Sequence, residues 1–228
     1  MLAGRPFVPA SFKSIVMDRF VVFIDAGHGG VDYSTTPPKY HCLAQGKQFQ
    51  HKGYTFFEGV WNRLVTDQVE RKLERLQIPF IRTYAPIEDW PLSDRRDRVQ
   101  FYLDAGYKGI LISSHANASP KHNARGWEVW TSRGQDKSDR LANILYGRTQ
   151  TLLGNKIYRM RTDKWSDGDI DKEANFGILR NQCPSILIEH GFFDHPEDAE
   201  QLRKRDIIER FAEAQVQTII QYRNGLDK

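Results

Sequence analysis

Residues 20–30 read FVVFIDAGHGG, and this stretch indicates the fold class of the whole chain. Its first half is a continuous apolar run, which is typical of a strand that is buried on both faces. The run stops at a glycine-rich turn that carries His28. Because glycines let the backbone turn tightly and let a ligand approach closely, the stretch predicts a buried strand over residues 20–25 that leads to a candidate functional histidine.

Predicted strands and helices alternate along the rest of the chain. Apolar side chains at three- and four-residue steps predict an amphipathic helix over residues 59–76. The same criteria predict further helices over residues 93–105, 137–153 and 206–222, one helix that starts near Pro196, and short strands over residues 78–82, 109–114, 127–131 and 185–189. An alternation of this kind predicts a single three-layer α/β/α domain around a mostly parallel sheet.

The predicted domain covers residues 20–228, and residues 1–19 are expected to form an N-terminal arm. Residues 31–57 contain prolines, several Gln and Lys residues and no clear apolar period, so they predict a long loop or an insertion. The composition, with 39% apolar and 27% charged residues, is ordinary for a globular protein and argues against disorder.

Charge, hydropathy and cysteine content restrict the class of protein. The net charge of +4 arises from 33 basic and 29 acidic residues, so it indicates a solvated surface and no nucleic-acid partner. The apolar runs are far shorter than the ~20 residues that cross a bilayer, and the N-terminus lacks the apolar segment of a secretory signal. We therefore expect synthesis in the cytoplasm without a signal peptide and no stable membrane association. Cys42 and Cys183 lie far apart and are expected to be free thiols.

Four short stretches each carry one His or Glu at the edge of an apolar run. They are DAGHGG at 25–30, FFEGVW at 56–61, SSHANAS at 113–119 and ILIEHGF at 186–192, and they contain His28, Glu58, His115 and Glu189. Zinc in a catalytic site takes three protein ligands from such side chains and leaves one position for water. We therefore predict a zinc site with ligands His28, Glu58 and His115 and with Glu189 as the catalytic carboxylate.

The predicted strands place three of these residues at one edge of the sheet. His28 lies just past the first strand, His115 follows the third, and Glu189 ends the last. Ligands bind at the carboxyl ends of the strands in an open parallel sheet. Glu58 begins the helix after the insertion and is expected to face the same edge. Zinc there would polarise a carbonyl and lower the pKa of a bound water, and a nearby carboxylate would transfer the proton to the leaving amine.

Two further segments, FGILR at 176–180 and PSILIEHGFFDH at 184–195, complete an ordered set with DAGHGG, the Glu at a helix start and SSHANA. In this order the motifs resemble the zinc-dependent N-acetylmuramoyl-L-alanine amidases of the Amidase_3 type, over roughly residues 20–222. The resemblance implies hydrolysis of the amide that joins the lactyl group of N-acetylmuramic acid to the L-alanine of the peptide stem in peptidoglycan. It also implies that His28, Glu58 and His115 bind zinc and that Glu189 is catalytic.

The resemblance assigns weaker roles to two more residues. Asn117, in the HANA segment, matches a position that the family often places beside the metal. Arg95 ends an L-x-x-R stretch that resembles one of the family, so it is expected to be either structural or substrate-facing.

The chain departs from the family pattern in two places. The link between His28 and Glu58 is unusually long and contains His41 and His51, either of which is an alternative third ligand. His190 follows Glu189 where the family commonly has a small or hydroxylic residue. The alternation of the strand points His190 to the opposite face, where we expect a hydrogen-bonded core or surface histidine.

An active zinc amidase on peptidoglycan is the expected function, with muramyl peptides as the partner. Another zinc hydrolase on the same scaffold, such as a peptidase, and a wall-binding module without catalysis are the alternatives. Trp127 and Trp130 are expected in the core, with a sugar-binding groove as the alternative. Without an export signal or an obvious wall-binding segment, the chain resembles a phage endolysin that lyses its host; a bacterial enzyme shown without its signal segment is the other interpretation.

Overall fold

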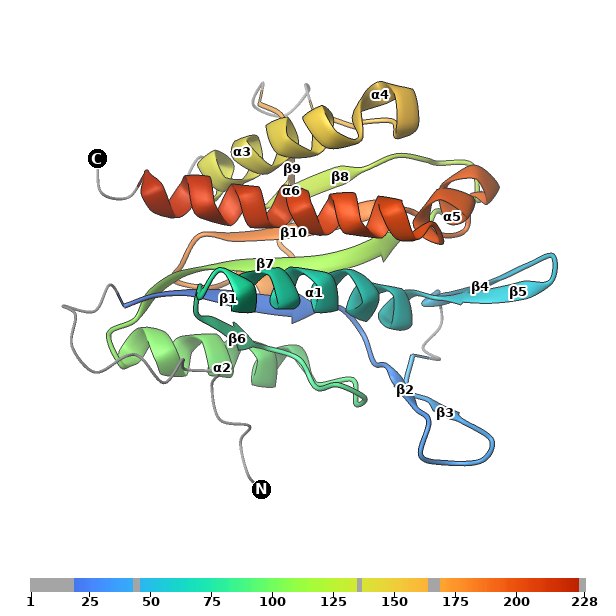
Figure 1. Ribbon diagram of the computed structural model, residues 1–228, viewed down its shortest axis with the longest axis horizontal. Coiled ribbons are helices and arrows are strands. Elements are labelled where there is room, and N and C mark those ends of the chain that lie inside the picture. The colour runs from blue at the N-terminus through green and yellow to red at the C-terminus, as the bar shows by residue number, and fades with distance from the viewer. Residues whose placement is uncertain (1–18, 43–45, 135–136, 164–168, 226–228) are drawn as a thin grey trace.

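Six strands form the central sheet of the computed structural model, in the spatial order β6 (Phe80–Arg82), β1 (Phe20–Ala26), β7 (Lys108–Asn117), β10 (Ser185–Phe192), β8 (Glu128–Thr131) and β9 (Lys172–Glu173) (Figure 1). The structure describes residues 19–42, 46–134, 137–163 and 169–225, without the side chains of residues 155–156. Strands β6, β1, β7 and β10 are parallel, whereas β8 runs antiparallel to β10 and β9 pairs with β8. The predicted mostly parallel sheet is confirmed.

Helices cover both faces of the sheet and give the three layers expected from the sequence. On one face, α1 (Glu58–Arg75), α6 (Arg205–Asn224) and α3 (Lys137–Leu152) lie side by side (Figure 1). On the other face lie α2 (Leu92–Asp104) and the short 3-10 helix η1 (Gly177–Leu179). Two short helices, α4 (Gly154–Ile157) and α5 (Pro196–Leu202), follow α3 and precede α6.

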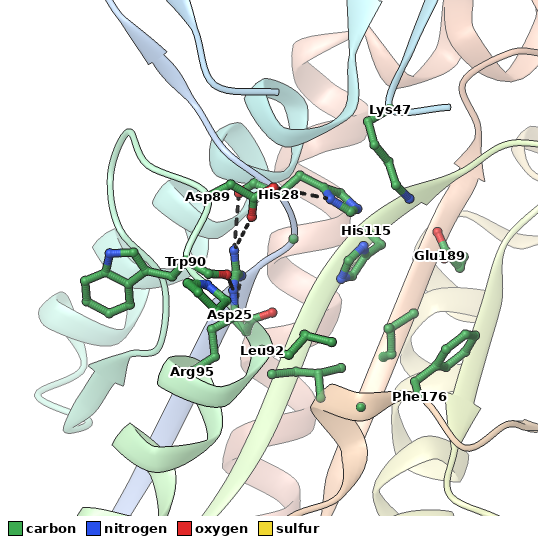
Figure 2. Close-up of a pocket in the computed structure, with 15 residues that line it drawn as sticks. Asp25, His28, Lys47, Asp89, Trp90, Leu92, Arg95, His115, Phe176 and Glu189 are labelled. Atoms are coloured by element: carbon green, nitrogen blue, oxygen red, sulfur yellow. Dashed lines mark hydrogen bonds and ion pairs between the residues drawn. The ribbon is translucent and has the colours of Figure 1, made fainter. Parts of the chain in front are cut away.

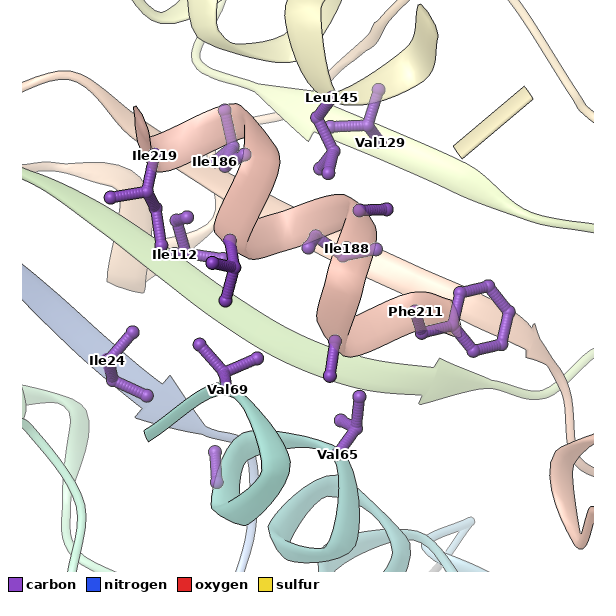
Figure 3. Close-up of a cluster of buried hydrophobic side chains, with 14 of the residues drawn as sticks. Ile24, Val65, Val69, Ile112, Val129, Leu145, Ile186, Ile188, Phe211 and Ile219 are labelled. Carbon is purple, nitrogen blue, oxygen red and sulfur yellow. The ribbon is translucent and has the colours of Figure 1, made fainter. Parts of the chain in front are cut away.

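The larger hydrophobic core lies between the sheet and α1, α6 and α3 (Figure 3). Alternate residues of a strand point to opposite faces, and Ile24, Ile112 and Ile188 point from three neighbouring strands toward these helices. Val69 of α1 and Phe211 of α6 pack against them. Each such side chain stabilises the fold by ~1.5–3 kcal/mol on burial, so this core holds the sheet and the helices together.

A smaller core on the α2 face ends before the carboxyl edge of the sheet. Phe23 of β1 and Leu111 of β7 belong to this core. Farther along the same strands, and on the same face, the side chains become polar: Asp25 in β1, His115 in β7 and Glu189 in β10. The change from apolar to polar residues places a candidate site at the carboxyl edge, on the α2 side.

Within residues 31–57, for which the sequence predicted a long loop or an insertion, the described residues contain two small hairpins. In the first, β2 (Val31–Asp32) pairs with β3 (Lys39–Tyr40), and in the second, β4 (Gln48–His51) pairs with β5 (Tyr54–Phe57). Gly53 turns the second hairpin with a positive φ of 88°. Both hairpins extend past the carboxyl ends of the parallel strands (Figure 1). Such short strands, with few apolar residues, carry too weak a period to be recognised in the sequence.

The predicted N-terminal arm lies, apart from Arg19, outside the described residues. Cys42 and Cys183 are buried free thiols, as predicted. Within the part of the chain that the structure describes, no helix combines the length and the apolar character that crossing a bilayer requires.

Candidate metal centre and active site

Three side chains from separate elements meet at the carboxyl edge of the sheet. Nδ1 of His115 lies 3.0 Å from Oε1 of Glu58, and Nε2 of His28 lies 3.2 Å from the same oxygen. The two imidazole rings are 5.2 Å apart and nearly perpendicular. His28 follows β1, His115 lies in β7 and Glu58 begins α1. The structure therefore brings together the three residues that the sequence predicts as metal ligands.

The backbone at the end of β1 sets the position of His28. This residue has a φ of +63°, a left-handed conformation that costs a non-glycine residue ~1–3 kcal/mol and is typical of functional sites. A Cβ atom on Gly27 would lie 2.0 Å from Cε1 of His115, so only glycine lets the two histidines approach each other. Nδ2 of Asn62, in α1, donates a hydrogen bond of 2.9 Å to the Gly27 carbonyl and holds this turn in place.

The donor atoms of this group fit a metal ion. Neither Nε2 of His28 nor Oε2 of Glu58 has a hydrogen-bond partner among the described residues, although both atoms are buried. One potential ligand atom from each of His28, Glu58 and His115 lies within 4.8 Å of the others. This spacing is compatible with one ion at the ~2.0–2.2 Å of zinc ligands, and two imidazoles with one carboxylate form a common catalytic ligand set.

The protonation of the group also suits a cation. Burial acts to raise the pKa of Glu58, but His115 and His28 lower this pKa by more, so it lies below its usual value. Burial lowers the pKa of His115 against the opposing effect of Glu58. Metal binding needs an ionised carboxylate and neutral imidazoles, and both shifts favour those states.

The two spare histidines lie apart from this group. The backbone N–H of His41 donates a hydrogen bond of 2.9 Å to the carbonyl of Gly30, and the His41 side chain is not among the clustered ligand atoms. Nε2 of His51 lies 2.7 Å from the carbonyl oxygen of Phe193. The geometry therefore favours Glu58 over either histidine as the third ligand.

Glu189 lies beside the candidate metal centre. The parallel register of β10 and β7 pairs Glu189 with His115, so the two side chains lie on the same face (Figure 2). Burial raises the pKa of Glu189 well above its usual value, and the charges of Glu58 and Glu128 raise it further. Oε2 of Glu189 has no hydrogen-bond partner among the described residues. A carboxyl group in this environment is suited to accept and return a proton.

Of the two roles predicted for Arg95, the contacts favour the structural one. Its Nη1 atom donates hydrogen bonds of 2.8 Å to Oδ1 of Asp25 and to the carbonyl oxygen of Ala26. Its Nη2 atom lies 3.1 Å from Oδ1 of Asp89 (Figure 2). The side chain is only 3% exposed. Arg95 therefore ties α2 and the loop before it to the end of β1, directly before His28.

Asn117 is connected to the site through Glu128, which the sequence analysis missed. Nδ2 of Asn117 donates a hydrogen bond of 3.2 Å to Oε2 of Glu128. The register of β8 and β10 places Glu128 beside Glu189, and Arg161 and Lys172 neutralise its buried charge. The two cations that pair with Glu128 are distant in the sequence, so no local pattern marks this residue as part of the site.

A pocket of about 510 Å³ opens beside the candidate metal centre (Figure 2). Trp90, Leu92 and Phe176 contribute apolar side chains to its lining, and Lys47 and Glu189 contribute charged ones. The sequence did not predict that these three apolar residues and Lys47 line a pocket, because they lie in loops or at the ends of elements, where no period applies. Phe176 opens the FGILR segment, so its motif was the available signal.

The alternative role for Trp127 as part of a sugar-binding groove is wrong. Its side chain is fully buried in the larger core. Trp130 lies on the other face of β8, where its ring is 5.3 Å from that of Phe176 and 5.0 Å from Nζ of Lys172.

His190 points away from the pocket, as predicted. It is buried in the larger core, where its ring lies 4.5 Å from that of Phe211 and 5.2 Å from that of Trp61. Nε2 of His190 is 3.5 Å from Oγ of Ser114. The expected core histidine is confirmed.

Comparison with known proteins gives one consistent result. A family model described as N-acetylmuramoyl-L-alanine amidase matches residues 22–221. The endolysin of Bacillus phage SPP1 is 26% identical over 207 residues, which cover 90% of this chain and 66% of the endolysin. The chain thus spans about two thirds of the length of that relative.

Two solved structures resemble the fold over nearly their whole length. The N-acetylmuramoyl-L-alanine amidase from Clostridium difficile 630 has a TM-score of 0.72 at 24% identity, with 91% of this chain and 98% of that chain covered. The amidase AmiC2 of Nostoc punctiforme has a TM-score of 0.70 at 22% identity, with 90% and 98% covered. At these identities the likeness establishes the shared fold.

Proposed function

We propose that this chain, which belongs to the N-acetylmuramoyl-L-alanine amidase family, hydrolyses the amide bond between N-acetylmuramic acid and L-alanine in peptidoglycan with zinc bound by His28, Glu58 and His115. The observation that carries this proposal is the convergence of these three ligand atoms, two of which, from His28 and His115, belong to residues that line the same pocket as Glu189. Residues 20–228 would act as one catalytic domain.

Zinc in this position supplies a Lewis acid that polarises the amide carbonyl and activates water. Glu189 takes the proton that the attacking water loses and returns it to the amide nitrogen as the carbon–nitrogen bond breaks. Its raised pKa suits this exchange, because a weakly acidic carboxyl holds a proton that a strongly acidic one would release. The products are a lactyl carboxylate on the sugar and a peptide with a free alanine amine.

The pocket has the polarity that such a substrate needs. Trp90, Leu92 and Phe176 offer apolar surface against which a sugar ring or a lactyl methyl group packs. His28, His115 and Glu189 face the same space and would orient the amide. The substrate would thus lie with its scissile bond beside His28, His115 and Glu189.

The biological role that we propose is lysis of a bacterial host through its cell wall. Support comes from the similarity to a phage protein described as an endolysin. The chain would act on the peptidoglycan layer, with muramyl peptides as its partners.

Product analysis on purified cell walls tests the proposal. We expect zinc-dependent release of free alanine amino groups without release of reducing sugars, and mass spectrometry should show intact stem peptides that begin with alanine. Products in which alanine remains attached to muramic acid would instead indicate a peptidase and would contradict the proposed bond.

A further inference from the structure

The β4–β5 hairpin brings Lys47 beside the candidate metal centre. The hairpin pairs Gln48 with Phe57, and the backbone N–H of Glu58 donates a hydrogen bond of 3.0 Å to the carbonyl of Lys47. The ladder therefore continues by one residue and makes Lys47 the cross-strand neighbour of Glu58. Directly opposite residues of an antiparallel pair have their side chains on the same face, ~4.5–5.5 Å apart. The backbone register itself thus directs Lys47 to the site.

Two contacts anchor the hairpin to the strand that carries Glu189. The ring of Phe56 stacks on that of Phe193, with 5.4 Å between the ring centroids and 3° between the planes. His51 is the second anchor, with Nε2 at 2.7 Å from the carbonyl oxygen of Phe193. Phe193 directly follows β10. Lys47 therefore has a defined position relative to Glu189 as well as to Glu58.

The ammonium group of Lys47 has donors that remain available to a substrate. Its Nζ atom forms an ion pair with Oε2 of Glu58 at 3.4 Å, and the side chain is 35% exposed. An ammonium carries three N–H donors, and no hydrogen bond to the described residues uses them. Arg95, the other cation that lines the pocket, is already engaged by Asp25 and Asp89. Figure 2 shows Lys47 reaching toward the space between His115 and Glu189.

We propose that Lys47 is a further catalytic residue, which donates a hydrogen bond to the carbonyl oxygen of the scissile amide as that oxygen becomes negative. This inference rests on the proposed function. When water attacks the carbonyl carbon, Glu189 takes a proton from the water, and the π electron pair of the carbonyl moves to its oxygen, where the Lys47 N–H stabilises the negative charge. When the pair returns, the carbon–nitrogen bond breaks and the nitrogen takes the proton from Glu189. Lys47 transfers no proton in either step.

A donor with this role stabilises the transition state more than the substrate. Removing one such donor lowers kcat by about 10²–10³-fold in enzymes that stabilise an oxyanion. An interaction that is equally strong in both states would change KM instead. The inference therefore predicts a loss in kcat with little change in KM.

The test compares K47M with wild-type protein, both loaded with zinc. Methionine preserves most of the length of the side chain and removes its charge. We expect kcat on cell walls to fall about 10²-fold, with KM within about twofold and with an unchanged zinc content. K47R should recover part of the lost rate because it restores a cation. K52M is the matched control: Lys52 is exposed in the turn of the same hairpin, and its loss should leave the rate unchanged.

A binding measurement separates the role of Lys47 from the function of the protein. By calorimetry, K47M should bind a muramyl phosphinate, whose tetrahedral anion resembles the transition state, about 10²-fold more weakly than wild type does. Muramyl dipeptide, which lacks this anion, should bind both proteins within about twofold. The proposal would be overturned if K47M lost affinity equally for the two ligands, if it lost affinity for neither, or if it no longer bound zinc. If wild type binds the phosphinate but cleaves another bond, the proposed function fails. The ratio of the phosphinate affinities of wild type and K47M still decides whether Lys47 stabilises a tetrahedral anion.

Discussion

The candidate site joins two regions that are stabilised in different ways. The sheet edge, which supplies His115 and Glu189, belongs to strands that pair on both sides and are covered by helices on both faces. Among the described residues, the strands of the β4–β5 hairpin, which leads into Glu58, pair only with each other. A two-stranded hairpin is marginally stable on its own in water. The sheet edge is thus positioned by its own hydrogen bonds, whereas the hairpin depends on its contacts with Phe193.

The sheet edge and the hairpin would therefore contribute to the site in different ways. The sheet edge holds groups whose mutual distance would decide the proposed metal binding and proton transfer. The hairpin completes the site from the solvent side, with Lys47 and the start of α1. If the comparison holds, changes to the polar side chains of the site should affect the chemistry directly, whereas changes to the side chains that dock the hairpin on Phe193 should act through the local stability of the hairpin.

The largest expected effect is loss of the metal from the sheet edge. In His115→Ala the site loses one of three ligands, so we expect the zinc content to fall to near zero and activity on cell walls to become undetectable. Metal analysis and product release measure both outcomes. His41→Ala, in the insertion but outside the clustered ligand atoms, is the control and should retain zinc. One zinc per chain in His115→Ala would show that the ligand set is wrong.

Glu189→Gln should separate chemistry from metal binding at the same edge. Glutamine keeps the shape of the side chain but can neither accept nor return the proton. We expect kcat to fall by about 10²–10⁴-fold, the range for loss of a general acid–base group. Zinc content and the thermal unfolding midpoint should stay near those of the wild type. A parallel loss of zinc would make Glu189 a ligand rather than the proton carrier.

Phe56→Ala should loosen the hairpin while the sheet stays intact. The ring is buried against Phe193, and such a truncation costs about 3 kcal/mol. By hydrogen exchange, amides of residues 48–57 should lose about 10²-fold of their protection, and those of β7 should change little. Phe101→Ala removes a ring of the same size from an exposed position in α2 and should leave both regions unchanged. If the hairpin and the sheet lost equal protection from hydrogen exchange, the two would form one cooperative unit.

The smallest expected effect is a pH dependence of stability that comes from the core side of the sheet edge. Burial lowers the pKa of His190 from 6.5 to about 3, so the native state keeps the ring neutral while the unfolded state takes up a proton. The stabilising contribution is therefore complete above pH 6.5 and is lost progressively as the pH falls toward 3. Between pH 7.5 and 5 this amounts to roughly 2 kcal/mol.

Urea unfolding at those two pH values measures this dependence, and His190→Gln is the comparison because it cannot titrate. The free energy of unfolding of the wild type should fall by more than that of the variant over this range. If the free energy of unfolding fell equally with pH in the two proteins, a buried neutral His190 would be contradicted.

The sequence was informative where function depends on local pattern. The apolar run of β1 and the strands before His115 and Glu189 predicted buried parallel strands, and the polar residue after each run marked the carboxyl edge. The same alternation correctly placed His190 on the core side. These inferences succeeded because strand direction and side-chain alternation follow from the backbone, which is the same in every sheet.

The segment between β1 and α1 shows where local pattern was insufficient. Glu58 was the predicted third ligand, but His41 and His51 stayed open as alternatives, because the sequence does not show where a long link places its residues in space. Docking of Phe56 on Phe193 and pairing within the hairpin decide that Glu58 reaches the two histidines. The partners in these contacts are up to 137 residues apart, counted from Phe56 to Phe193.

By itself, then, the sequence determined the layered α/β fold, the edge that carries the site and the three candidate ligands. Only the tertiary structure favoured Glu58 over His41 and His51, and only it revealed the approach of Lys47, the buried network of Glu128 and the apolar lining with Trp90 and Phe176. The physical reason is the distance along the sequence between the residues that interact. Hydrophobic periodicity reports what a residue does within its own strand or helix, whereas these features depend on contacts between segments that meet only when the chain is folded.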